Sequence, residues 1–371
     1  MMKLYALSCV FLVCCLYANP ARSEPDAPPL FEQHSLLELG MKIDFDSLCR
    51  PRETPDCDYS ASEISYMDGD EERIIPVEVR IRGGWRALKS NCDIPLLFIR
   101  FPDQDTEGTP FAGQSMLPLT THCGRAKLTD GGMTSAKYAS YEQYLLKEYL
   151  AYRLYEELTD TSLRVRLAKM SYKIPGKGGR ARVNYAFFTE HFKSLAERQH
   201  AELLPRESFD HKALDTQAAD RVALFEFMIG NSDWSLVRQR NAILLLTENG
   251  KQIPVPFDLD MSGLVNAPYA GPPPSLPIDE VTERYYLGYC HPDIDWDNLF
   301  SDFLSRQNSL VSQVDEIDGL YKRERRSAKR YLESFFDILQ NPELRNAKII
   351  EGCQAWPPQA VDHMAPEVLG R

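Results

Sequence analysis

One stretch of the sequence decides how the chain folds: Phe227-Met228-Ile229-Gly230-Asn231-Ser232-Asp233-Trp234-Ser235. It completes an apolar pattern with helical spacing over residues 217–230. Gly230 is a residue type that commonly terminates a helix. The sequence therefore predicts a helix that ends at Gly230 and a polar loop that presents Asp233 directly after it.

A strand pair is predicted downstream, over residues 241–257. It turns at Glu248-Asn249-Gly250, a sequence typical of a hairpin. Its second strand ends in Val255-Pro256-Phe257-Asp258-Leu259-Asp260. We therefore expect the side chains at positions 233, 241 and 258 to meet at one end of this hairpin.

These three side chains carry oxygen atoms suited to phosphoryl transfer. That reaction uses one carboxylate to orient the attacking hydroxyl, and an amide with a second carboxylate to hold magnesium on the phosphates. Asp233 is the candidate for the first task, and Asn241 and Asp258 are candidates for the second. Asp260 lies close enough in sequence to support these ligands or to bind a second metal ion.

The Gly-Asn-x-Asp loop, the downstream Asn241 and the Pro-x-Asp-x-Asp-like strand end resemble one protein family. They are similar to the atypical kinases related to spore coat protein H, and more distantly to toxin kinases of the HipA type. The resemblance spans about residues 75–290, and its specific part is residues 227–260. It implies an α+β, two-lobed protein-kinase-like fold, with a β-rich N-lobe and a helical C-lobe, that uses ATP with Mg²⁺ or Mn²⁺. Asp233 would be the catalytic aspartate, with Asn241, Asp258 and Asp260 at the metal.

The resemblance also implies nucleotide-binding residues upstream. A strand over residues 74–83 leads into a turn at Arg82-Gly83-Gly84 that would approach the phosphates. A helix over residues 141–158 would supply Glu148 or Glu142 to pair with a phosphate-binding lysine. The strand ending at Glu190 would form the hinge beside adenine.

The expected kinase lysine is absent from the predicted third strand, residues 115–121, where Pro118 occupies the middle. Lys89, Arg100 and Lys127 are alternatives by position. We favour Arg100 because the segment 95–101 has a strand pattern. Because this lysine is missing, there is a second interpretation, in which the chain is an inactive pseudokinase that serves as a secreted binding module.

Two other readings use the same residues. Asp258-Leu259-Asp260 is also the Asp-x-Asp pattern of glycosyltransferases that bind a metal and a sugar nucleotide, and transfer of adenylyl groups is a related option. In a purely structural reading, Asn231 and Asp233 cap a helix or a turn.

The N-terminus has the anatomy of a secretory signal peptide. Lys3 precedes an apolar run from Leu4 to Tyr17, and small residues follow near position 23. The run is too short to span a bilayer, and no later stretch is long and apolar enough. We expect a soluble protein, secreted or periplasmic, without an integral membrane segment after signal removal.

Six of the nine cysteines remain after the signal, an even number that favours disulfides in an oxidising compartment. Their spacing does not match a structural zinc site. We predict local pairing: Cys49 with Cys57, Cys92 with Cys123, and Cys290 with Cys353.

Signal removal takes Lys3 and Arg22, so the formal charge changes from −12 to −14. Such an acidic chain argues against nucleic acid and anionic membranes as partners. A protein or small-molecule hydroxyl acceptor is the expected partner.

The predicted organisation has five parts. They are the signal peptide (1–23), a leader that is flexible over 24–35 with a cysteine-closed loop and a short helical patch from 36 (24–60), a β-rich N-lobe with one long helix (61–192), a helical C-lobe with the metal loop (193–355) and a flexible tail (356–371). Further strands are expected at 164–174 and 182–190, a polar connector at 193–215 and mostly helix at 293–345.

Overall fold

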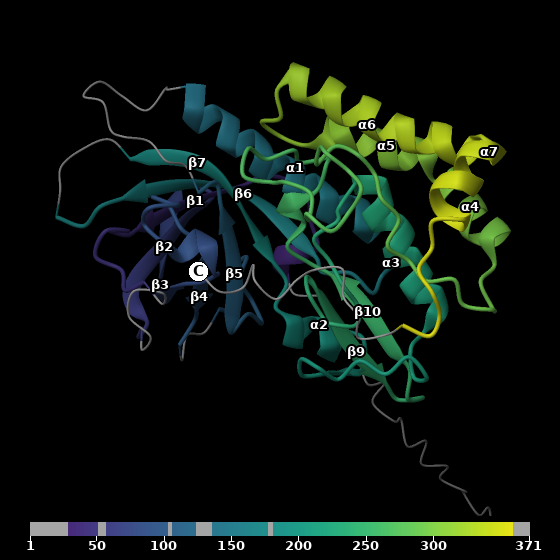
Figure 1. Cartoon of the computed structure of the whole chain (residues 1–371). Helices are drawn as coiled ribbons and strands as arrows, with labels where there is room; N and C mark the ends of the chain where they lie inside the picture. The colour runs from purple at the N-terminus through teal and green to yellow at the C-terminus, as the bar shows by residue number, and fades with distance from the viewer. Residues whose placement is uncertain (1–28, 51–56, 103–105, 124–135, 177–180, 359–371) are drawn as a thin grey trace, which may run out of the picture.

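A computed structural model describes residues 29–50, 57–102, 106–123, 136–176 and 181–358 (Figure 1). The predicted signal peptide and most of the predicted tail lie outside these residues. Within the described part of the chain, no helix has the length and apolar character needed to cross a membrane.

A closed β-barrel forms the first half of the described chain (Figure 1). Its strands follow the order β1-β2-β3-β4-β5-β7-β6, and β1 closes the barrel by pairing in parallel with β6. From Ile75 to Ile81 every second side chain of β3 is buried, as the period-two pattern predicts. The strands are β1 (Leu37–Lys42), β2 (Ser60–Asp68), β3 (Glu71–Ile81), β4 (Leu97–Arg100), β5 (Met116–Thr121), β6 (Val165–Lys173) and β7 (Arg182–Thr189).

The second half is mainly helical and carries a small sheet, with the strand order β10-β9-β8. The predicted hairpin is β9 paired antiparallel with β10. The strands are β8 (Ala201–Leu203), β9 (Ala242–Thr247) and β10 (Gln252–Pro256). The helices are α2 (Phe192–Arg198), α3 (Thr216–Ile229), α4 (Trp296–Ser305), α5 (Gln307–Glu316), α6 (Lys322–Gln340) and α7 (Pro342–Arg345). Short helical turns are η1 (Pro29–Phe31), η2 (Trp85–Ala87), η3 (Leu259–Met261) and η4 (Asn346–Ile350).

Helix α1 (Ala136–Leu158) connects the two halves (Figure 1). Its predicted stripe of leucines is fully buried and packs in the same core as α3 and α6. A second core fills the barrel. The structure thus confirms an α+β protein with a β-rich first half and a helix-rich second half. The leucines of the stripe are Leu146, Leu150, Leu154 and Leu158.

Three local expectations were wrong. The helical patch after residue 36 is instead strand β1, because Leu39 and Met41 alternate with exposed or half-buried neighbours and enter the barrel core. The polar connector at 193–215 contains α2 and β8. The leader packs against the barrel from residue 29, where Leu30 and Phe31 are buried.

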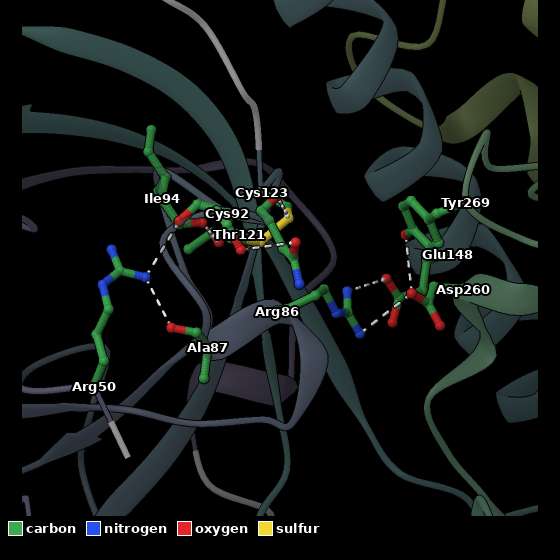
Figure 2. Close-up of a disulfide and its surroundings, with 12 residues drawn as sticks. Arg50, Arg86, Ala87, Cys92, Ile94, Thr121, Cys123, Glu148, Asp260 and Tyr269 are labelled. Carbon is green, nitrogen blue, oxygen red and sulfur yellow. Dashed lines mark hydrogen bonds and ion pairs between the residues drawn. A yellow bond between two sulfur atoms is a disulfide. The ribbon is translucent and has the colours of Figure 1, made fainter. Parts of the chain in front are cut away.

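The three disulfides join the pairs predicted from the sequence. They link Cys49 to Cys57, Cys92 to Cys123, and Cys290 to Cys353. Each bond closes a loop within one part of the fold, and a native disulfide commonly contributes about 2–4 kcal/mol to stability. The Cys92–Cys123 bond joins the segment after β3 to the residues that follow β5 (Figure 2).

Candidate active site

The loop after α3 holds Asp233 in a fixed position. Gly230 adopts a left-handed backbone with φ of 66° and ends the helix, as predicted. The Asn231 side-chain oxygen then accepts a hydrogen bond from the Asp233 amide at 3.0 Å. This closes a tight turn that directs the Asp233 carboxylate away from the helix end.

Asp233 and Asn241 meet, as the sequence predicts. The Asn241 side-chain amide donates to the Asp233 backbone carbonyl at 2.7 Å and to its Oδ2 at 3.0 Å. Arg240 donates to Asp233 Oδ1 and forms an ion pair with it. Both carboxylate oxygens are therefore oriented by neighbours from the start of β9.

The segment after β10 is joined by backbone hydrogen bonds to the residues around the Asp233 loop. Phe257 donates its amide to the Asn241 carbonyl at 2.9 Å, and Gly263 donates to the Gly230 carbonyl at 3.0 Å. Asp258 has a left-handed backbone with φ of 57°, and its amide donates to the Tyr152 hydroxyl of α1 at 2.8 Å. These bonds fix the place of Asp258 relative to the Asp233 loop.

Arg86 brings the barrel into contact with this segment (Figure 2). Its Nη2 lies 2.7 Å from Asp258 Oδ1 and 3.4 Å from Asp260 Oδ2, and its Nη1 lies 3.7 Å from Glu148 Oε2. The Arg86 side chain is only 11% exposed. Tyr269 donates its hydroxyl to the same Asp260 oxygen, Oδ2, at 2.9 Å. One guanidinium thus faces three carboxyl groups.

The backbone that carries Arg86 is held from the barrel side. Arg50 donates from Nη1 to the Ala87 carbonyl at 2.8 Å and to the Cys92 carbonyl at 3.3 Å (Figure 2). The disulfide between Cys92 and Cys123 restrains the same loop. The position of the guanidinium therefore follows from a fixed loop.

Arg82 is a second cation at the junction. Its Nη2 donates to Thr120 Oγ1 at 2.8 Å, and its buried Nε has no hydrogen-bond partner within the described residues. Burial and the neighbouring Arg86 lower the pKa of Arg82. Gly83 and Gly84 follow on the exposed side of the turn.

Burial shifts the acidic groups of the cluster. It raises the pKa of Glu148 to about 8, although Arg86 acts in the opposite direction. Burial likewise raises the pKa of Asp260 to about 6, against the attraction of Arg86. The pKa of Asp233 is also raised by burial, and Arg240 opposes this shift. Such shifts are common where acid–base chemistry takes place, although ion-pair networks produce them as well.

Two other candidates have partners elsewhere. Arg100 forms an ion pair with Glu78, and its side chain is 46% exposed on the barrel. Arg86, not Arg100, is therefore the cation that meets Asp258. Glu190 is buried at the end of β7 and accepts from Arg198 Nε at 2.9 Å and Nη2 at 2.8 Å.

The alternative helix glutamate, Glu142, has a structural role. Its Oε1 accepts from the Asn184 side chain and from the Tyr185 amide, both at 2.9 Å. Of the two glutamates proposed for an ion pair with a cation of the barrel, Glu148 is the one that meets it.

Four residues of the site were not anticipated. Arg86 follows the Arg82-Gly83-Gly84 turn closely, and Arg240 directly precedes Asn241, so both lay beside motifs already recognised. Tyr152 lies four residues after Glu148 on α1 and so shares its helix face. Tyr269 lies in an irregular segment and has no sequence signal of this kind.

The oxygen donors of the site suit Mg²⁺ or Mn²⁺. Among the described residues, no three histidine, cysteine or acidic side chains are grouped closely enough to hold a metal ion by themselves. Magnesium, however, is commonly bound through one or two protein carboxylates, with water and substrate phosphates completing its shell. Asp258 and Asp260 provide such a pair.

Comparison with known proteins finds no family model and no curated protein that matches the chain.

Proposed function

We propose that the chain is an exported enzyme with a two-lobed, protein-kinase-like fold that transfers a phosphoryl group from ATP to a hydroxyl acceptor. The observation that carries this proposal is the contact of Arg86 with both Glu148 of α1 and Asp258 after β10. Protein kinases likewise pair a cation from the β-rich lobe with a helix glutamate, close to a metal-binding aspartate. In this chain an arginine outside the usual strand would supply that cation.

Each side chain of the cluster then has a role. Asp233 would accept the hydrogen bond of the acceptor hydroxyl, with Arg240 and Asn241 keeping its carboxylate oriented. Asp258 and Asp260 would hold Mg²⁺ or Mn²⁺, and the Asn241 backbone carbonyl accepts a hydrogen bond from Phe257, which directly precedes Asp258. The metal supplies positive charge that stabilises the phosphates during transfer.

The barrel side would bind the nucleotide. Arg86 and Arg82 would neutralise phosphate oxygens, because guanidinium groups bind them in bidentate fashion. The exposed Gly83 and Gly84 leave the backbone accessible to phosphates. The backbone at Glu190, where β7 leaves the barrel, is the proposed neighbour of adenine, because the Glu190 side chain is paired with Arg198.

The three disulfides support a secreted or periplasmic location, because such bonds persist in oxidising compartments. The acceptor would be a protein or small molecule with a hydroxyl group. The acidic composition favours neither nucleic acid nor an anionic membrane as a partner.

A second candidate is a secreted binding module that keeps a kinase-like shape without activity. One observation favours it: Arg86 already contacts the carboxylates that a metal would need. In this reading the ion-pair cluster only joins the two halves of the molecule.

Thermal melting with millimolar ATP and Mg²⁺ tests nucleotide binding. We expect a metal-dependent rise in the melting temperature, since a ligand at ten times its Kd stabilises a protein by about 1.4 kcal/mol. Asp258→Ala should abolish the rise. Asp70→Ala, in the exposed turn between β2 and β3, should preserve it. A wild-type protein without a shift would rule out the ATP site.

Transfer is tested with ATP labelled at either the α or the γ phosphate. Label transferred only from the γ position supports a kinase, whereas transfer from the α position identifies an adenylyl transferase. The absence of both a melting shift and transfer supports the binding module, and a shift with a sugar nucleotide and Mn²⁺ but not with ATP identifies a glycosyltransferase. Asp233→Asn should reduce transfer about 10²-fold or more while the melting shift persists.

A further inference from the structure

A cavity of about 620 Å³ lies beside the proposed active site, between α1, α6 and the segment that follows Asp260. Its size is typical of small-molecule sites. Helix α1 contributes Tyr144 and Lys147, and the segment after Asp260 contributes Gly263 and Leu264. The remaining lining residues are Asn266, Thr282, Arg323, Glu324, Ser327, Arg330, Tyr331 and Ser334.

The charge of this cavity is opposite to that of the chain. Lys147, Arg323 and Arg330 face it together with a single acidic residue, Glu324. The chain as a whole carries a formal charge of −12. The basic character of the cavity is therefore a local feature and does not follow from the composition.

Two arginines and two serines of α6 line the cavity from one face of the helix. Arg323, Ser327, Arg330 and Ser334 are spaced by four, three and four residues, so they lie on one face of the helix. Arg323 and Arg330 are exposed, and neither has an ion-pair partner within the described residues. Their guanidinium groups remain available to bind an anion in bidentate fashion.

Lys147 is the buried cation of the cavity. Its side chain is 5% exposed, and its Nζ lies 3.4 Å from Glu324 Oε2. Burial lowers the pKa of Lys147, while Glu324 opposes the shift. A bound anion would therefore give Lys147 a second negatively charged partner besides Glu324.

The cavity is joined to the site by Tyr331. This α6 side chain lies so close to Gly230 and Gly263 that a Cβ on either glycine would come within 2.3 Å of its hydroxyl. Gly230 begins the Asp233 loop, and Gly263 follows Asp260 by three residues. A ligand in the cavity would thus lie next to both segments that carry the acidic cluster.

We propose that this cavity binds a small organic anion with two or more negative groups, either phosphates or carboxylates. Arg323 and Arg330 bind the outer group, and Lys147 attracts the inner one. The proposal does not rest on phosphoryl transfer, because it concerns cavity residues outside the acidic cluster.

Isothermal titration with inorganic pyrophosphate and with citrate tests the proposal and separates phosphate from carboxylate ligands. Both titrations use the purified protein without nucleotide or divalent metal, at constant ionic strength. We expect saturable binding of at least one probe. The double variant R323E/R330E should bind it about tenfold more weakly or worse, equivalent to a loss of about 1.4 kcal/mol.

The matched control is K322E/R326E. It makes the same charge change on exposed residues of α6 that do not line the cavity. It should weaken binding clearly less than R323E/R330E does, since neither Lys322 nor Arg326 lines the cavity. Melting curves establish that both variants are folded, and the milder R323Q/R330Q replaces R323E/R330E if that variant is not.

Two results would overturn the proposal. One is the absence of saturable binding of either probe at millimolar concentration. The other is equal weakening in the cavity variant and the control, which would assign the binding to the overall charge of α6. Because neither probe contains a nucleotide, these results are independent of the ATP experiment.

Discussion

Arg86 Nη2 lies 2.7 Å from Asp258 Oδ1, although the two residues are 172 positions apart in the sequence. This contact joins the segment after β3 to the segment after β10, and thus the barrel to the helical half. The same guanidinium also faces Glu148 and Asp260. Whether the site binds ATP or not, this cluster couples the two halves of the molecule.

Arg86→Met should destabilise the fold at neutral pH. The Asp260 side chain is 8% exposed and its pKa is about 6, so at neutral pH the substitution leaves this buried carboxylate without a counter-charge, whereas Glu148 stays protonated. Breaking a buried pair in this way costs about 3–5 kcal/mol. The loss should be smaller at pH 5.5 than at pH 7.5, because protonation removes the uncompensated charge. Urea denaturation at the two pH values measures it.

The control is Arg100→Met, which breaks the exposed pair with Glu78 on the barrel. Exposed ion pairs contribute about 0–1 kcal/mol. Comparable losses in the two variants would show that the Arg86 cluster is not the junction described here.

The raised pKa of Glu148 predicts a loss of stability as the pH rises. Burial moves this pKa from 4.5 to about 8, so the folded state retains a proton that the unfolded state releases. The corresponding stability is fully present below pH 4.5 and is lost as the pH approaches 8. One such group contributes a slope of at most about 1.4 kcal/mol per pH unit.

Glu148→Gln should flatten this pH dependence between pH 5 and 8. Urea denaturation across the range gives the slope. Glu72→Gln, at an exposed position of β3, should leave the wild-type slope unchanged. A variant at 148 that retained the full slope would assign the dependence to other groups.

Local patterns were sufficient to predict much of the fold. The β3 alternation, the α1 leucine stripe and the β9–β10 hairpin each lie in a short window of sequence. Gly230 and Asp233 were placed correctly for the same reason, because helix termination and turn formation depend on adjacent residues.

The contacts of Arg86 could not be predicted in this way, because they depend on how the barrel meets α1 and the segment after β10. Strand β1 was missed for a similar reason, since it closes the barrel against β6, which is distant in sequence. Arg100 was a different error. Leu97 and Ile99 face the core, so the period-two pattern already directs Arg100 outward.

Gly263→Ala tests whether Tyr331 fixes the segment that carries Asp258 and Asp260. The new Cβ would lie 2.3 Å from the Tyr331 hydroxyl and 2.7 Å from the Val281 carbonyl oxygen. Such overpacking commonly costs about 1–3 kcal/mol. We expect a loss of this size in urea denaturation, together with a smaller melting shift with ATP if the segment binds the nucleotide.

Gly271→Ala is the matched control, because no atom outside its neighbours lies within 4 Å of the new Cβ. It should change stability by less than about 0.5 kcal/mol. Tyr331→Phe combined with Gly263→Ala should recover part of the loss, because it removes the closer of the two contacts, whereas the Val281 carbonyl remains. If the combined variant showed no recovery, the contact between Tyr331 and Gly263 would not explain the effect, and the segment after Asp260 would be held by other interactions.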